Sequence, residues 1–473
     1  MSESRNFDLI VIGSGPAGEK GAAQAAYFGK SVALIEKEPV LGGASANTGT
    51  LPSKTLRETA LFLSGFRNRD LGGIRLVLDH QVTISDFMTH ERAVNERERA
   101  RIGTNLDRHR VEVFRGSASL VDPHTVAVRP TSAPAVQLRG DVILIAVGSR
   151  PYHPPVFPFE DPRIDDSDTI LQLPSIPPSM LVIGGGVIGC EYACMFAILG
   201  VEVTVVEQRD RLLGSLDAEV AEAVRQRMEG LGVRLFLSDS VESFHAGEGV
   251  EARLKSGAVL NPHTTLISAG RNGNTDGLGL ENVGVQVNAR GLIAVDDHYR
   301  TTVPHIFAAG DVIGSPSLAS TAMEQARVAM VNAFDLKYKD KVATILPYGI
   351  YTIPECSMAG ETEEGLNAKG IPYVVGKATY DSNARGQIIG DRHGFLKLLF
   401  GRDDMKLLGV HVIGEGATEL VHVGLTALLL QQGAGLFIET CYNYPTLTEL
   451  YKYAAYDALG RKASMAQDEA QLA

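Results

Sequence analysis

Two glycine-rich turns carry the clearest chemical signal in this sequence. Each follows a short apolar stretch, and in both copies an acidic residue lies 18 positions after the third glycine. Glycines at this spacing let the backbone approach a pyrophosphate at a helix N-terminus, and the acid accepts a hydrogen bond from a ribose hydroxyl. One such turn is a weak signal, but its repetition at equal spacing predicts two dinucleotide sites. The residues are Gly13, Gly15, Gly18 and Glu36 in the first copy, and Gly184, Gly186, Gly189 and Glu207 in the second.

The elements that must position these residues follow from the apolar pattern. Helices are expected to end near Gly29 and Gly200, to fill residues 56–110, and to span 217–231. The charged run 91–101 indicates a solvated helix face rather than a binding patch. The proline-rich run 151–162 is typical of a linker. In the first half of the chain, strands are predicted at 7–12, 31–35, 111–114, 125–128, 136–138, 141–147, 180–183 and 201–206.

After the second unit the chain returns to the first through residues 305–311, and from 346 the pattern changes. Alternating strands at 372–379, 395–400 and 407–413, with helices after Gly416 and Pro445, predict an α+β domain. The polar tail 462–473 is expected to fray. The predicted fold is therefore α/β, with two Rossmann-like domains and a C-terminal α+β domain. Its predicted boundaries are 1–150 with 272–345, 151–271, and 346–473.

Composition limits the function classes. The 473 residues are enough for about three domains of roughly 150 residues. A net charge of −12 argues against binding to nucleic acid or to an anionic membrane surface. No apolar run reaches the roughly 20 residues of a membrane span. Cys190 and Cys194 lie one helical turn apart, but no Cys or His cluster completes a metal site, so we expect no metal and a cytoplasmic protein.

The segment 41–54 connects these units to redox chemistry. With Gly42, Gly43, Pro52 and Lys54 it resembles the pattern G-G-x-C-x-x-x-x-C-x-P-x-K of the flavoprotein disulfide reductases, of the class-I pyridine nucleotide-disulfide oxidoreductase family. The two cysteine positions hold Ser45 and Thr50. Because a hydroxyl cannot form a disulfide or act as a thiolate nucleophile at neutral pH, the dithiol chemistry is absent.

The resemblance implies that the first unit binds FAD. Glu36 would face the adenosine ribose, Gly116 and Ala118 would lie along the adenine, and Asp311 would bind near the ribityl chain. The helix opening at Ala319 would direct its positive end at the flavin, which would stabilise the anionic reduced form. The implied FAD-binding set is Gly13, Gly15, Gly18, Glu36, Lys37, Gly42, Gly43, Lys54, Gly116, Ala118, Gly148, Gly310, Asp311 and Ala319.

The second unit resembles the family's nicotinamide nucleotide domain. Glu191 corresponds to the glutamate that pairs with the lysine beside flavin N5, here Lys54. A purely structural bridge is the alternative. Glu207 suits NAD(H), whereas Arg209 and Arg211 could meet the 2′-phosphate of NADP(H) or could be solvated loop residues. The implied nucleotide-binding set is Gly184, Gly186, Gly189, Glu207, Arg209 and Gly270.

Residues 442–449 resemble the family's H-x-H-P-x-x-x-E segment, which a partner subunit contributes. The second histidine, the acid/base of the dithiol, is replaced by Tyr444, while Pro445 and Glu449 are retained. A phenol ionises near pH 10 and cannot replace an imidazole that titrates near 6.5. We therefore interpret Tyr444 as a packing or hydrogen-bonding residue that closes the dithiol side of the flavin. The implied catalytic group is Lys54, Glu191, Tyr444 and Glu449.

The sequences of several segments resemble those of the soluble pyridine nucleotide transhydrogenases; these include residues 148–151, 310–314, 351–355 and 442–446. The resemblance implies reversible hydride transfer between NADPH and NAD+ through FAD in a ping-pong cycle. It also implies a homodimer or higher homo-oligomer. The alternatives are an NAD(P)H diaphorase or oxidase, and a non-catalytic FAD-binding redox sensor or structural subunit. Disulfide reduction is the least favoured.

Overall fold

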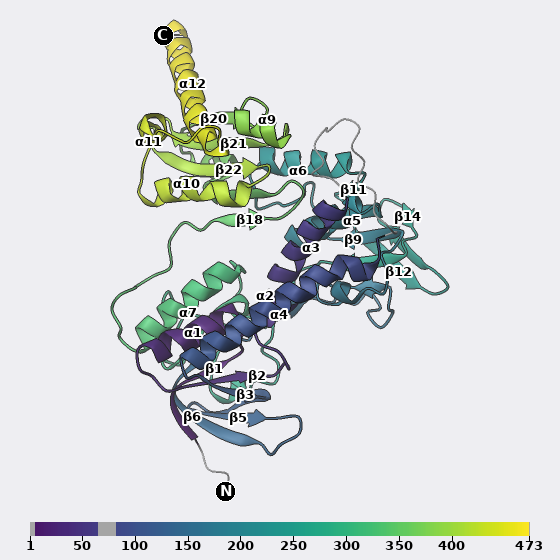
Figure 1. Cartoon of the computed structure of the whole chain (residues 1–473), viewed down its shortest axis with the longest axis vertical. Coiled ribbons are helices and arrows are strands. Elements are labelled where there is room, and N and C mark those ends of the chain that lie inside the picture. The colour runs from purple at the N-terminus through teal and green to yellow at the C-terminus, as the bar shows by residue number, and fades with distance from the viewer. Residues whose placement is uncertain (1–4, 65–81, 473) are drawn as a thin grey trace.

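The computed structural model describes residues 5–64 and 82–472. The first unit is a mixed sheet of seven strands, in which β3, β2, β1, β6 and β17 run parallel and β5 runs antiparallel to β6 and β4. Helices α1 and α7 lie over the sheet (Figure 1). The central strands β1, β2 and β6 contain buried apolar runs, at residues 9–12, 32–35 and 142–145, which is typical of parallel strands covered on both faces. The elements are β1 (Arg5–Ile12), α1 (Pro16–Tyr27), β2 (Val32–Glu36), β3 (Glu112–Arg115), β4 (Ser117–Asp122), β5 (Thr125–Arg129), β6 (Val136–Ile145), β17 (Ile306–Ala308) and α7 (Ala319–Ala333).

One prediction in this unit was wrong. The strands expected at 136–138 and 141–147 form a single strand, β6, which pairs with β1 from Leu138 to Ile145. Gly140 lies between the two expected strands in the sequence, but in the structure it lies inside β6, where Ile10 packs closely. A Cβ at Gly140 would approach Ile10 Cδ1 to 2.9 Å. The glycine therefore makes room for a neighbouring side chain and does not break the strand.

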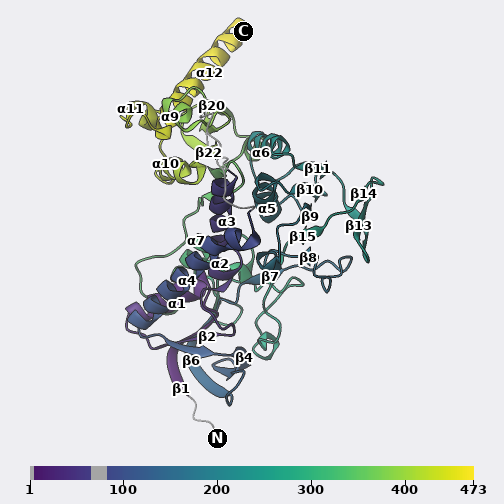
Figure 2. The same ribbon diagram turned by 45° about the vertical axis from the view of Figure 1, so that its right-hand side comes forward.

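The second unit is a five-stranded parallel sheet of order β11-β10-β9-β15-β8. The small strands β13 and β14 lie on its outer side (Figure 2). The two units are joined where β7 (Ser149–Pro151) pairs with β16 (Arg271–Gly273). The elements are β8 (Ile164–Asp165), β9 (Ser179–Ile183), α5 (Val187–Ile198), β10 (Glu202–Glu207), α6 (Ala218–Gly230), β11 (Arg234–Leu237), β12 (Val241–Ala246), β13 (Val250–Leu254), β14 (Val259–Leu260) and β15 (Thr264–Ile267).

Three helices connect the units: α2 (Gly43–Asn47), α3 (Thr50–Leu63) and α4 (Ile84–Arg108). The predicted helical stretch 56–110 lies partly outside the described residues, and within them it forms the rest of α3 and α4. Thr83 caps α4 with a reciprocal bond to Asp86, which is a capping box. Helix α3 packs on α5 of the second unit, so the segment after the first glycine turn reaches the second one.

The C-terminal domain is an antiparallel sheet, β18-β19-β22-β21-β20, covered by helices. Its final helix was predicted to fray after residue 461, but α12 continues to Leu472 and extends beyond the domain (Figure 1). The segment is rich in strong helix formers and lacks proline. The elements are β18 (Tyr348–Ile350), β19 (Cys356–Gly360), α8 (Glu363–Lys369), β20 (Tyr373–Thr379), α9 (Ala384–Ile389), β21 (Phe395–Gly401), β22 (Leu407–Ile413), α10 (Ala417–Leu429), α11 (Ala434–Glu439) and α12 (Leu450–Leu472).

Among the described residues, no helix has both the length and the apolar character needed to cross a bilayer.

Candidate active site

The first glycine turn divides into structural and open positions. A Cβ at Gly18 would lie 1.8 Å from the carbonyl oxygen of Gly13, and a Cβ at Gly13 would lie 2.4 Å from the carbonyl oxygen of Ala146. These two glycines are required by the fold itself. A Cβ at Gly15 would meet only the Cα of Gly43, at 3.9 Å. The space above Gly15 at the N-terminus of α1 is therefore open, as a pyrophosphate would need.

The acid at the end of β2 is held firmly beside this turn. Glu36 is buried, and its Oε2 accepts hydrogen bonds from the amide of Ser14 at 2.9 Å and from its hydroxyl at 2.5 Å. Its other oxygen accepts from the amide of Glu38 at 2.9 Å. Ser14 was not predicted as a site residue, because nothing in a G-x-G pattern distinguishes the middle residue. Lys37 points into solvent, where its Nζ lies 3.7 Å from Glu38.

The segment that resembles the redox-active region touches the first turn. The Gly42 amide donates to the hydroxyl of Ser14 at 3.0 Å. A Cβ on Gly43 would come within 2.9 Å of the Gly15 Cα, so the two backbones are in direct contact. Both glycines have positive φ, which the close packing requires. Ser45 follows in α2 and Thr50 opens α3.

Lys54, one turn into α3, joins the two units. Its Nζ lies 2.6 Å from Oε2 of Glu191 on α5, and the side chains are 27% and 4% exposed. The second oxygen of Glu191 accepts from the amide of Tyr351 at 2.9 Å, and the Lys54 ammonium lies 5.0 Å from the centre of the Tyr351 ring. Ser53 provides a further oxygen 3.2 Å from Nζ. The glutamate is thus fixed on both oxygens, while the lysine is partly accessible.

Tyr351 is a contact that sequence spacing did not identify. It directly follows β18, the first strand of the C-terminal sheet, and contributes a backbone amide and a ring face, neither of which leaves a pattern in the sequence. The structure also does not bring all predicted catalytic residues together. Tyr444 is 76% exposed on the C-terminal domain, and Glu449 lies on the same segment. Among the contacts of the described residues, neither bonds to Lys54 or Glu191.

Other predicted FAD-site residues surround the edge of the first sheet. The amide of Gly116 donates to the carbonyl of Glu36 at 2.9 Å, and Ala118 follows on β4. Gly148 has a φ of +68° with no atom within 4 Å of its Cβ position. Asp311 accepts from the Ser149 hydroxyl at 3.0 Å.

Helix α7 fixes the loop that follows β17. The amide of Gly310 donates to Oε1 of Gln325 on α7 at 2.9 Å, and this hydrogen bond is buried. Ala319 is the first residue of α7, as expected. The predicted residues therefore lie at the carboxyl ends of the strands, from the end of β6 to the start of α7.

The second glycine turn repeats the first. A Cβ at Gly189 would lie 2.0 Å from the carbonyl oxygen of Gly184, whereas one at Gly186 would meet nothing within 4 Å. Glu207 is buried and accepts from the Gly185 amide at 2.6 Å. The same division into structural and open glycines in both units fits two bound dinucleotides. Gly270, with a φ of +110°, follows the strand β15 that borders this turn.

The two candidate arginines differ in their surroundings. Arg209 is exposed, and its amide and Nε lie 2.9 and 3.2 Å from Glu207 Oε1, so it lies beside the acid that the sequence predicts to bind the ribose. Arg211 instead bonds the carbonyl of Gly214 at 3.0 Å and approaches Glu364 of the C-terminal domain at 3.6 Å. Only Arg209 lies where a 2′-phosphate next to Glu207 would be.

The cysteines supply no replacement dithiol. Cys190, Cys194 and Cys356 are buried, and Cys441 is exposed; all four are free. Burial raises the pKa of Cys194 and Cys356 to about 12, and that of Cys190 well above its usual range. The buried thiols are therefore protonated near neutral pH and are poor nucleophiles.

Comparison with known proteins assigns the class. The profile of the pyridine nucleotide-disulphide oxidoreductases matches residues 7–326, and the profile of their dimerisation domain matches residues 346–455. The chain belongs to the pyridine nucleotide-disulphide oxidoreductase family, and its C-terminal domain is the dimerisation domain of that family.

Within the family, the chain is similar to proteins named soluble pyridine nucleotide transhydrogenase. It is 44% identical to the one from Mycobacterium bovis, over 98% of this chain and 99% of the relative. It is 42% identical to those from Chromohalobacter salexigens and Pseudomonas aeruginosa, over 96% of this chain and 99% of each relative.

Solved structures share the architecture. LpdA from Mycobacterium tuberculosis matches with a TM-score of 0.88 at 27% identity, over 96% of this chain and 99% of that chain. The HOCl-induced flavoprotein disulfide reductase RclA from Escherichia coli matches with a TM-score of 0.84 at 25% identity, over 96% of this chain and 99% of that chain.

Proposed function

We propose that this protein is a soluble NAD(P)+ transhydrogenase that transfers hydride reversibly between NADPH and NAD+ with FAD as its cofactor, in a ping-pong cycle. The observation that carries the proposal is the Lys54–Glu191 ion pair, complete at 2.6 Å, in a chain that has Ser45 and Thr50 where a dithiol would be. A site with a charged pair but no internal dithiol accepts electrons from one nucleotide and needs an external acceptor. The names of the relatives at 42–44% identity supply that acceptor, a second nucleotide.

FAD, when bound, accepts a hydride and returns it to the next nucleotide. The first unit would hold it through the open turn at Gly15, the anchored carboxylate of Glu36 and Asp311, and the start of α7 at Ala319. The second unit would hold the nucleotides in turn through the open turn at Gly186, with Glu207 and Arg209 at the adenosine ribose.

Lys54 would provide a positive charge that stabilises the negative charge arriving with the hydride, and Glu191 would hold the ammonium in place. Because hydride transfer between nucleotides moves no proton to the protein, the chain needs no general base. Tyr444 in the acid/base position of the family is compatible with this chemistry and not with dithiol reduction.

The dimerisation domain supports a homodimer, and Glu449 together with Tyr444 would face the partner's site. We retain the domain boundaries predicted above as part of this proposal. We also place the protein in the cytoplasm, a reducing compartment in which four unpaired cysteines are ordinary.

The test is anaerobic turnover of NADPH with thio-NAD+, with lipoamide and oxidised glutathione as parallel acceptors. Reduction of thio-NAD+ without reduction of either disulfide is expected. Reduction of the flavin without reduction of thio-NAD+ would refute the proposal and identify a diaphorase or oxidase. A flavin that NADPH does not reduce at all would indicate a non-catalytic FAD protein.

A further inference from the structure

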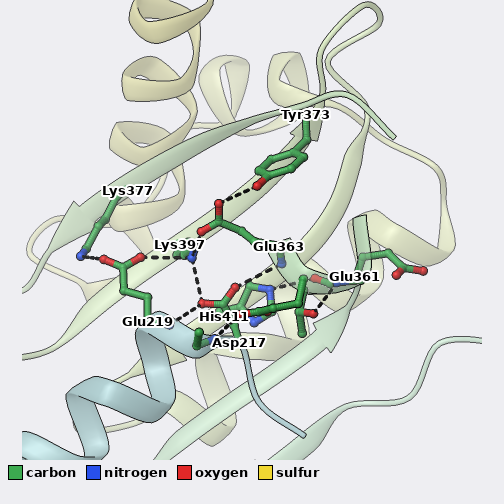
Figure 3. Close-up of polar contacts among 12 residues, drawn as sticks. Asp217, Glu219, Glu361, Glu363, Tyr373, Lys377, Lys397 and His411 are labelled. Atoms are coloured by element: carbon green, nitrogen blue, oxygen red, sulfur yellow. Dashed lines mark hydrogen bonds and ion pairs between the residues drawn. The ribbon is translucent and has the colours of Figure 1, made fainter. Parts of the chain in front are cut away.

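A group of charges around one buried lysine joins the second unit to the dimerisation domain (Figure 3). We call it the Lys397 cluster; it comprises Lys397 on β21, Asp217 and Glu219 at the start of α6, and Glu363 in α8. Lys397 is fully buried, and its Nζ lies 2.8 Å from Asp217 Oδ1 and 3.1 Å from Glu219 Oε2. It also bonds Glu363. One ammonium therefore connects three carboxylates from two domains.

The three carboxylates lie close enough together to resemble a cation site, with ligand atoms within 4.8 Å of one another. The Lys397 ammonium already bonds each of them, so the cluster has its own cation. Although burial lowers the pKa of Lys397, hydrogen bonds to Asp217 and Glu363 raise it overall, so the amine remains charged. Removal of this charge would leave the buried carboxylate of Asp217 without its cation.

The same residues cap two helices across the domain boundary. Asp217 is the N-cap of α6, where its Oδ1 accepts from the Glu219 amide at 3.2 Å. Its Oδ2 accepts from the amide of Glu363, the first residue of α8, at 3.3 Å. In return, Glu364 accepts from the amide of Ala218 at 3.0 Å. Each helix start thus satisfies a donor of the other, which fixes their relative position.

Asp217 also directly follows the loop that carries Arg209, one of the residues proposed to contact the nucleotide. Residues 208–216 connect β10, which ends in Glu207, to α6. Within the loop, the amide of Leu213 donates to the carbonyl of Gly185 in the second glycine turn at 2.9 Å. Leu213 has a φ of +48°, an unfavourable conformation for a leucine, and its side chain is buried. Such a conformation persists only when the surroundings determine it, so the loop depends on its anchors.

We propose that Lys397 is a positioning residue for nucleotide binding, which, by fixing Asp217, holds loop 208–216 in the shape that presents Arg209, beside Glu207, to the adenosine ribose. The inference rests on the proposed function, because it takes the second unit as the NAD(P)(H) site. It adds that the dimerisation domain determines affinity for the adenosine half of the nucleotide. The proposal places the nicotinamide half near Lys54 and Glu191, so its binding should not depend on this loop.

The test compares NADPH with reduced nicotinamide mononucleotide, which lacks the adenosine half. In Lys397→Met, anaerobic flavin reduction should show a KM for NADPH raised roughly 3- to 30-fold, the range of coupling through packed elements, with the rate at saturation unchanged. Reduction by the mononucleotide should be unaffected. Lys369→Met, which removes a lysine from an exposed ion pair with Glu361 in the same domain, controls for the loss of one lysine charge.

A KM for NADPH that stays at the control value, or an equal loss with the mononucleotide, would overturn the inference, since a general loosening of the protein affects both reductants. If Lys397→Met does not fold, Asp217→Asn keeps a capping oxygen and should show the same pattern more weakly. Calorimetric titration with NADP+ gives the comparison without turnover. The inference therefore fails or stands independently of whether the wild type reduces thio-NAD+.

Discussion

Replacement of Lys54 by methionine removes the ammonium at the centre of the proposed site while keeping the length of the side chain. The hydrogen bond to Glu191 is 2.6 Å long, and the lysine is 27% exposed. A hydrogen bond between charged groups contributes about 1.5–3 kcal/mol, and the partial exposure of Lys54 favours the lower half of this range. If this energy is delivered during hydride transfer, the rate falls roughly 10- to 50-fold, because 1.4 kcal/mol corresponds to a factor of ten.

The assay is stopped-flow flavin reduction by saturating NADPH in the absence of oxygen. Lys20→Met is the matched control: Lys20 lies 2.9 Å from Glu19, with side chains 18% and 2% exposed, in a pair of similar burial on α1. Both variants should lose some thermal stability, but only Lys54→Met should slow reduction by tenfold or more. If both variants reduce at the same rate, the Lys54 charge does not take part in hydride transfer.

Three further outcomes are expected. Gly15→Ala should fold but lose most of its FAD, whereas Gly18→Ala should fail to fold, because only a Cβ at Gly18 collides with the backbone. The melting temperature of the FAD-free protein and its flavin content after reconstitution distinguish these two effects. A Ser45→Cys, Thr50→Cys variant should not reduce lipoamide above background, because the acid/base histidine is absent; turnover comparable to thio-NAD+ reduction would contradict this. Burial raises the pKa of Asp165 from 3.8 to about 6, so the folded protein retains a proton that the unfolded chain loses, and stability should fall as pH rises from about 4 to 6. Asp165→Asn should abolish that slope and add about 2–3 kcal/mol at pH 7.5 in urea unfolding; an unchanged slope would show that another group is responsible.

The sequence was sufficient for the repeated units, because their signal is local. The glycine spacing, the apolar strands and the acid of each copy lie within about 30 residues of one another, as a βαβ unit requires. Helix α6 was predicted to start at Asp217, and this residue is its N-cap. The assignment of the chain to its family is confirmed, while the roles of individual site residues remain predictions.

The remaining features depend on contacts between distant segments. In the sequence, Lys397 looks like an ordinary polar residue of a predicted strand. Only the folded chain brings it to Asp217, 180 positions away. Arg211 and Arg209 look equivalent in the sequence, but one is bound by Glu364 of another domain. Helix propensity favours the continuation of α12, but the prediction gave more weight to the polar composition of the tail.

The antiparallel pair β7 and β16 has a consequence for protein engineering. The chain leaves the first unit at Ser149–Pro151 and returns at Arg271–Gly273, so the two crossing points are adjacent. An inserted domain with neighbouring ends can be exchanged as a cassette without altering the host sheet. A chimera that imports the second unit from a relative would, however, break the contact between Asp217 and Lys397 unless the imported unit carries a matching aspartate. Whether such a chimera keeps the position of its second unit would therefore depend on a contact far from the two crossing points.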